Sequence, residues 1–191
     1  MEPRLIARGI PELFPMVRTG DPRSHVSYVI RDLCTNLGHY EATDGPNPNP
    51  SLMELGSTFE DVVAEGLANR FARSNPDKFV RPGELERDGL IGTPDLMDFD
   101  DWAMIEVKLT KMSARHGIES DKFWKYWVQL KAYCHMIGCS TGRLHIGFIN
   151  GDYRGLEVDY QVWEEEFTPN ELIANWRMLV NQHKIIMGRA T

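Results

Sequence analysis

The sequence lacks the marks of membrane and secreted proteins. No apolar run in its 191 residues approaches the roughly 20 residues that cross a bilayer. The N-terminal stretch MEPRLIARGIPELF carries charges and prolines where a signal peptide would be apolar. We therefore expect a cytoplasmic protein with no membrane partner.

Cysteine is scarce, which argues against a disulfide framework or a metal–thiolate centre. Cys34, Cys134 and Cys139 are odd in number and include no CxxC pair. A zinc or iron–sulfur centre usually needs a fourth ligand and a tighter pair. We expect three small buried hydrophobic side chains and no iron–sulfur cluster.

The sequence also lacks the overall basic charge of most nucleic-acid-binding proteins, since its formal net charge is −7. The charge is uneven, however, because residues 104–131 hold six Lys or Arg residues against three acidic ones. Acidic residues concentrate elsewhere, notably at 164–166, which we interpret as a solvated turn. This pattern permits a local nucleic-acid contact without requiring one.

Hydrophobic periodicity predicts alternating helices and strands. Expected helices cover 24–37, 51–74, 121–137 and 168–187, and the Ser51/Glu54 and Thr168/Glu171 spacings match capping boxes. Expected strands cover 79–80, 84–87, 89–99, 102–110, 143–150 and 156–163. We expect one domain over 1–191, in which an irregular arm (1–22) precedes a core (24–149) and a C-terminal strand and helix (150–191). Its class is α/β, with a central mixed sheet flanked by helices.

Two charged residues interrupt the apolar strand MIEVKL. Glu106 and Lys108 alternate with apolar residues and therefore share one face of the strand. A tight turn at Asp100-Asp101 would fold Asp95 back beside them. The sequence therefore brings two carboxylates and a lysine to one place on the sheet edge.

Such a group suits hydrolysis of a phosphodiester. Paired carboxylates at Asp95 and Glu106 favour Mg²⁺ or Mn²⁺, which lowers the pKa of a bound water. Lys108 would orient that water or neutralise the developing charge, and the backbone carbonyl of Val107 is a further candidate ligand. The alternative is a surface Glu–Lys pair with an unrelated aspartate in a turn.

Two predicted helices add polar candidates. Glu60 is the acid beside the apolar face of the helix before the hairpin. Gln129 and Tyr133 lie four residues apart and share a face of the helix after it. Taken singly, Glu60 is more readily interpreted as a surface acid and Gln129 as a solvated helix position. Residues 111–120 read as an exposed, basic and mobile loop.

These residues, in this order, resemble the PD-(D/E)xK nucleases, and more narrowly their RecB-like and lambda-exonuclease-like branch. The resemblance covers about residues 24–149 and rests on GSTFE, then G-T-P-D, then I-E-V-K, then Q-L-K-A-Y. It implies a restriction-endonuclease-like core.

The resemblance also implies a role for each position. Asp95, Glu106 and Lys108 correspond to the catalytic residues, and Asp95 and Glu106 to metal ligands joined by Glu60 and the Val107 carbonyl. Residues that would contact DNA are Gln129, Tyr133, Ser27, Arg31, Thr93, Lys111 and Arg115.

The expected function is thus a Mg²⁺- or Mn²⁺-dependent deoxyribonuclease. Exonuclease action is favoured, in DNA recombination, repair or processing in a bacterial cell or a phage-infected host. A homo-oligomer, or a recombination or replication partner protein, is possible on this pattern. Two alternatives stay open: a catalytically silent DNA-binding or assembly module on the same fold, and a metal-dependent phosphohydrolase acting on a small substrate.

Overall fold

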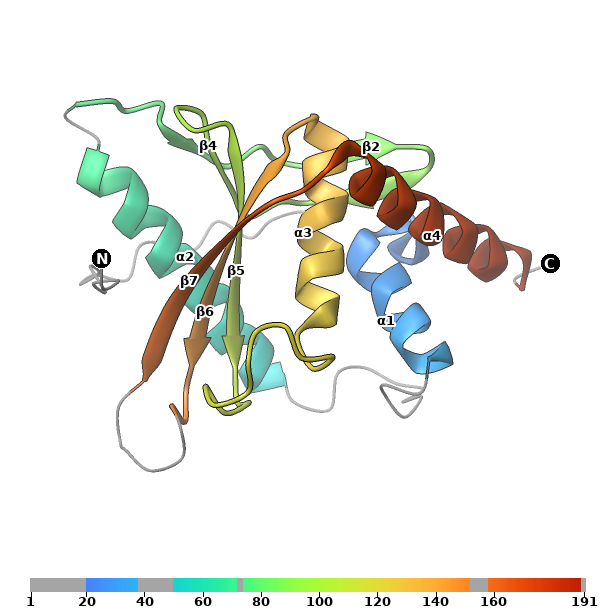
Figure 1. The fold of residues 1–191 in the computed structure, drawn as a ribbon, viewed down its shortest axis with the longest axis horizontal. Helices are drawn as coiled ribbons and strands as arrows, with labels where there is room; N and C mark the ends of the chain where they lie inside the picture. The colour runs from blue at the N-terminus through green and yellow to red at the C-terminus, as the bar shows by residue number, and fades with distance from the viewer. Residues whose placement is uncertain (1–19, 38–49, 72–73, 152–157, 190–191) are drawn as a thin grey trace.

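The computed structural model describes residues 20–37, 50–71, 74–151 and 158–189, and only the helical backbone of 50–53 (Figure 1). The expected N-terminal arm and the turn after Gly151 lie almost entirely outside these residues. No helix among the described residues is long and apolar enough to span a membrane.

A mixed five-stranded sheet forms the centre of the molecule. Its order is β1-β4-β5-β6-β7, and only the β5–β6 pair is parallel. The strands are β1 (Phe79–Val80), β4 (Leu96–Asp98), β5 (Ala103–Thr110), β6 (Thr141–Phe148) and β7 (Asp159–Glu166). A separate antiparallel pair joins β2 (Leu85–Arg87) to β3 (Leu90–Gly92).

Helices cover both faces of the sheet (Figure 1). One face packs on α2 (Pro50–Phe71) through a small apolar cluster that includes Val63, Ile105 and Val107. The other face and its covering helices share a larger core, which includes Leu130, Leu144 and Leu179. Those helices are α1 (Val26–Asn36), α3 (Trp124–Ile137) and α4 (Pro169–Gly188). The α/β class and the mixed sheet flanked by helices are confirmed.

The expected single strand over 89–99 is wrong, because it divides into β3 and β4 at Thr93-Pro94-Asp95. Proline has no backbone N–H and cannot donate to a ladder, so the sheet pairing stops there. β3 then leaves the central sheet and pairs with β2, while Leu96 resumes pairing opposite Ile105. This division places Asp95 immediately before the first residue of β4.

Four smaller expectations are also wrong. Residues 164–166 are exposed positions of the edge strand β7 and not a turn, since they pair with 141–143 of β6. The helix expected from Asp121 begins at Trp124, after turns over 121–123, and Ser51 lies inside α2. The segment 111–120 is not uniformly exposed, because Ser113 and Ile118 are buried.

The hairpin turn is held by one buried carboxylate. Asp98 is 1% exposed and accepts hydrogen bonds from the backbone N–H groups of Asp100 and Asp101. Arg143 of β6 donates to the other oxygen of Asp98 at 2.7 Å. The turn therefore fixes how β4 returns along β5, and with it where Asp95 lies.

Candidate active site

Asp95, Glu106 and Lys108 lie together beside Leu96, the first residue of β4. Oδ2 of Asp95 accepts a hydrogen bond from the backbone N–H of Val107 at 2.7 Å. Nζ of Lys108 lies 3.8 Å from the same oxygen and forms an ion pair with Oε1 of Glu106. At Val107, the hydrogen-bond partner of β5 is therefore the side chain of Asp95 and not the backbone of a further β4 residue.

Glu106 is the most unusual of these side chains because it is fully buried. Neither of its oxygens accepts a well-formed hydrogen bond, although the Lys108 ammonium contacts one of them. Burial, and then the charge of Asp95, raise the pKa of Glu106 well above its usual value. A buried carboxylate without hydrogen bonds is costly unless a cation compensates it.

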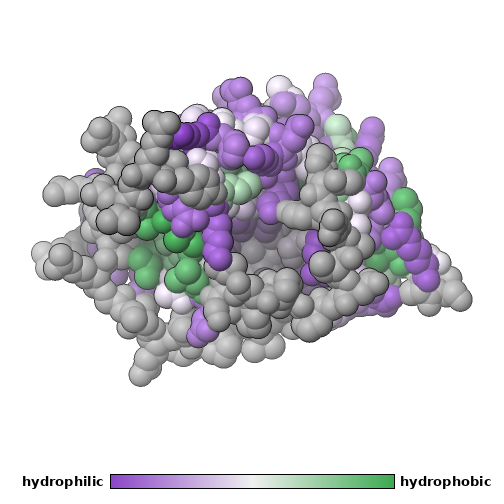
Figure 2. All heavy atoms as spheres, turned by 90° about the horizontal axis from the view of Figure 1, so that it is seen from below, coloured by the Kyte–Doolittle hydropathy of each residue, from purple (hydrophilic) through white to green (hydrophobic). Residues whose placement is uncertain are grey.

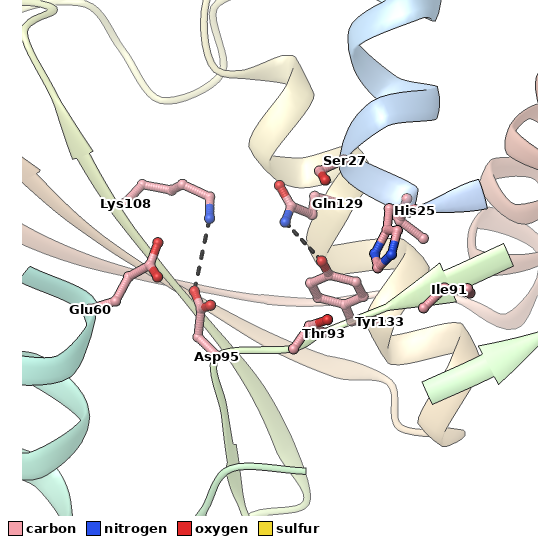
Figure 3. A pocket seen from close by; sticks show the side chains of 10 residues that line it. His25, Ser27, Glu60, Ile91, Thr93, Asp95, Lys108, Gln129 and Tyr133 are labelled. Atoms are coloured by element: carbon pink, nitrogen blue, oxygen red, sulfur yellow. Dashed lines mark hydrogen bonds and ion pairs between the residues drawn. The ribbon is translucent and has the colours of Figure 1, made fainter. Parts of the chain in front are cut away.

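Glu60 approaches the same place from α2. Its side chain and those of Asp95 and Lys108 line one cavity (Figure 3). Burial and the nearby Asp95 raise the pKa of Glu60 to about 7. The neighbouring Asp61 turns away and pairs with Arg81 at 2.5 Å. Glu60 therefore faces the hairpin, and Asp61 does not line the cavity.

The site holds more negative than positive charge. Burial alone would lower the pKa of Lys108, but Glu106, Asp95 and Glu60 together raise it above its usual value. Lys108 contacts two of these acids but carries a single positive charge. A divalent cation would balance the negative charge that the three carboxylates carry in excess of it. The donor set of hard carboxylate oxygens fits Mg²⁺ or Mn²⁺.

The geometry is not that of a preformed metal site. Among the residues that the structure describes, no three His, Cys, Asp or Glu side chains are arranged to hold an ion. Glu106 is directed toward Lys108, and it does not line the cavity. A cation would therefore have to draw the carboxylates of Glu60, Asp95 and Glu106 closer together.

The carbonyl of Val107 is placed to join them. In an antiparallel pair, the N–H and C=O of one residue point toward the same neighbouring strand. Since the N–H of Val107 points to Asp95, its carbonyl also faces the side that β4 leaves open.

The opposite wall of the cavity carries the predicted DNA contacts. The cavity has a volume of about 60 Å³, and Ser27 of α1, Thr93, Gln129 and Tyr133 line it (Figure 3). Nε2 of Gln129 donates to the Tyr133 hydroxyl at 2.9 Å, which fixes the two polar groups together. The Tyr133 ring lies against Gly92, where an added Cβ would come within 2.8 Å of it.

Three predicted contact residues do not line this cavity. Arg31 is exposed, and its guanidinium lies 4.9 Å from the centre of the Tyr28 ring. Arg115 lies in the 111–120 segment, and Lys111 lines a different cavity. The face on which β5 and β6 end is mostly hydrophilic where its residues are described, and it is recessed near its middle (Figure 2).

Sequence reasoning missed three residues of the cavity wall, which are His25, Val26 and Ile91. His25 precedes α1 in an extended conformation and forms a parallel bridge with Ile91. Both line the cavity beside Ser27. The prolines at 11, 15 and 22 hinted at an irregular approach to the helix, but no local pattern pairs His25 with a strand 66 positions away.

The three cysteines and two histidines, His135 and His145, lie outside this cavity. Cys34, Cys134 and Cys139 are buried and free, as expected for small hydrophobic residues. His145 is buried, and its Nδ1 lies 2.6 Å from the hydroxyl of Tyr160. His135 stacks on Trp176 with ring centroids 5.0 Å apart.

Comparison of the sequence with protein-family models and with curated proteins finds no match. Solved structures do match. The alkaline exonuclease of Laribacter hongkongensis in complex with dAMP has a TM-score of 0.53 at 17% identity, over 88% of this chain and 90% of that one. Another structure of the same exonuclease has a TM-score of 0.51 at 16% identity, over 87% and 88%. The predicted exonuclease-like fold is thereby confirmed. A phage-related exonuclease from Haemophilus somnus 129PT has a TM-score of 0.48 at 12% identity, over 86% and 83%.

Proposed function

We propose that the chain is a metal-dependent deoxyribonuclease that degrades DNA from its ends. The observation that carries this proposal is the fully buried carboxylate of Glu106, which contacts the Lys108 ammonium and lies close to Asp95 at the open edge of β5. A sheet built only for packing has no reason to bury such a group. The exonuclease fold of the structures that match supports the same choice of reaction.

Four oxygen donors would hold the ion: the carboxylates of Asp95, Glu106 and Glu60 and the carbonyl of Val107. A bound Mg²⁺ or Mn²⁺ supplies an activated water and stabilises negative charge on the phosphate. The Lys108 ammonium, which contacts the acids and lines the cavity, neutralises part of the charge that develops there.

The far wall would position the substrate. The Gln129 amide and the Tyr133 hydroxyl are hydrogen-bonded to each other and face the cavity, so each can direct a polar atom at the DNA backbone. Ser27 and Thr93 add hydroxyl groups beside them. Arg31, Lys111 and Arg115 would contact the DNA farther from the bond that is cut.

The proposed setting is DNA recombination, repair or processing in the cytoplasm of a bacterium or of a phage-infected cell. We also propose that the chain works with DNA and with either further copies of itself or a recombination or replication protein.

The test is cleavage of linear and circular DNA, single- and double-stranded, in Mg²⁺, Mn²⁺ or EDTA. We expect metal-dependent cleavage of linear DNA that is lost in Asp95→Asn and Lys108→Ala, while circular DNA resists. Cleavage in EDTA, or cleavage that survives both substitutions, would contradict the mechanism, and cleavage of circular DNA would contradict action from the ends.

A second candidate is a DNA-binding module that does not cut. The observation in its favour is the close Lys108–Glu106 pair, which leaves the acids apart. Metal-independent DNA binding without cleavage of any of the four substrates would establish this candidate.

A further inference from the structure

A second and larger cavity lies at the C-terminal end of β5. Its volume is about 400 Å³, within the size range of ligand sites. The residues that line it include Cys34, Lys111, Lys122, Trp124, Lys125 and Tyr126.

The same three elements line both cavities. On α1, Ser27 lines the first cavity and Cys34 the second. On β5, Lys108 lines the first and Thr110 the second, and Lys111 follows directly after the strand. α3 runs in the opposite direction along the two cavities, because Gln129 lines the first cavity and Trp124, Lys125 and Tyr126 of the first turn line the second. The second cavity therefore continues the first along the groove between α1, α3 and β5.

The spacing of the two cavities suits a strand of nucleotides. Ser27 and Cys34 are seven positions apart, which corresponds to about 10 Å at 1.5 Å per helical residue. A stacked strand advances about 3.4 Å per nucleotide and an unstacked strand advances farther, so this length corresponds to at most about three nucleotides. A strand with one phosphate beside Asp95 and Lys108 would therefore place nearby nucleotides in the second cavity.

The chemistry of the lining fits the same occupant. Lys111, Lys122 and Lys125 outnumber the single acid, Asp121, and cations bind phosphates. Nζ of Lys122 lies 2.8 Å from Nε2 of His116, which holds the ammonium at the rim.

Aromatic side chains lie among these cations. The ammonium of Lys125 is 5.0 Å from the centre of the Tyr126 ring, and the half-buried Trp124 lines the cavity beside it. Aromatic faces stack on bases that have left the duplex.

We propose that this second cavity binds unpaired nucleotides of the strand being cut, a few positions from the phosphate in the first cavity. The inference rests on the proposed nuclease function. Cations alone would suit duplex DNA equally, but a base can reach Trp124 only when it is unstacked. The occupant is therefore single-stranded DNA, and a DNA end that enters the groove must separate there.

The test uses single-stranded oligonucleotides that carry one 2-aminopurine at successive positions from each end, in EDTA so that no cleavage competes. We expect fluorescence quenching to peak at about two to four positions from one end. Trp124→Leu should lose that peak and bind roughly tenfold more weakly. The matched control is Trp163→Leu on the edge strand β7, which should keep both.

Lysine variants give a second measurement that does not depend on packing of the tryptophan. Lys125→Ala should lower the slope of log K against log salt by about 0.7. Lys184→Ala, an exposed position of α4, should leave the slope unchanged. Thermal unfolding checks that each variant is folded.

The outcomes separate this inference from the proposed function. Unaltered oligonucleotide binding by folded Trp124→Leu and Lys125→Ala, or binding of duplex DNA only, would overturn the inference, even if the wild-type protein cuts DNA. Position-dependent quenching without cleavage of any substrate would instead refute the proposed nuclease and leave the strand-binding cavity.

Discussion

Asp95 has two separable roles, and a pair of substitutions distinguishes them. Its Oδ2 accepts a hydrogen bond from the Val107 N–H, and its charge raises the pKa values of Glu60 and Glu106. Asp95→Asn keeps an oxygen that can accept the bond but removes the charge. Asp95→Ala removes both. Each variant relieves the repulsion of the two glutamates equally, so the difference between them isolates the hydrogen bond.

We expect both variants to lose cleavage. We also expect Asp95→Ala to be less stable than Asp95→Asn. The Val107 N–H lies in a buried residue, and leaving such a donor unpaired costs about 1–3 kcal/mol. For a domain of this size, that corresponds to a decrease in Tm of roughly 2–12 °C.

The measurements are urea or thermal unfolding of both variants in EDTA, and cleavage of linear DNA in Mg²⁺. Equal stability of Asp95→Asn and Asp95→Ala would refute the structural role of the hydrogen bond. Retained cleavage by Asp95→Asn would refute the assignment of Asp95 as a metal ligand.

Three further outcomes are expected. Mg²⁺ or Mn²⁺ at 100 times its Kd should raise the free energy of unfolding by about 2.7 kcal/mol, and Asp95→Asn should lose this gain in the same titration. Burial lowers the pKa of His145 to about 4, so the unfolded state binds the proton first as pH falls. The free energy of unfolding should therefore decrease by up to about 3 kcal/mol between pH 6.5 and 4. Urea unfolding of His145→Gln should lack this decrease. Gly147→Ala places a Cβ 2.7 Å from the Phe59 ring and should destabilise by about 1–3 kcal/mol, whereas Gly56→Ala, in α2 with open space around it, should stabilise by up to about 1 kcal/mol in the same assay.

The elements with strong local signals were predictable. The capping box at Thr168 and Glu171 forms as expected, and the alternation around Glu106 correctly indicated its shared face with Lys108. These features depend on spacing within one element, which a sequence displays directly.

The features that depend on distant pairing were not predictable. The strand expected over 89–99 breaks at Pro94, which the sequence does display, but only the fold reveals that β3 then pairs with β2. His25 reaches the cavity through a bridge to Ile91, and Glu106 turns toward Lys108 rather than into the cavity. Each outcome is decided by tertiary contacts that no local pattern encodes.

The absence of β4–β5 pairing before Leu96 has a wider consequence. Had the β4–β5 ladder continued beyond the Leu96–Ile105 pair, the backbone N–H and C=O of Val107 would have formed hydrogen bonds with β4. Because pairing stops there, the N–H of Val107 donates to the Asp95 side chain, and the carbonyl of Val107 faces the side that β4 leaves open. Regular sheet and candidate active site thus compete for the same backbone atoms. A substitution that extends the pairing of β4, such as replacement of Pro94 by a strand-forming residue, would be expected to make a more regular protein and a less active one.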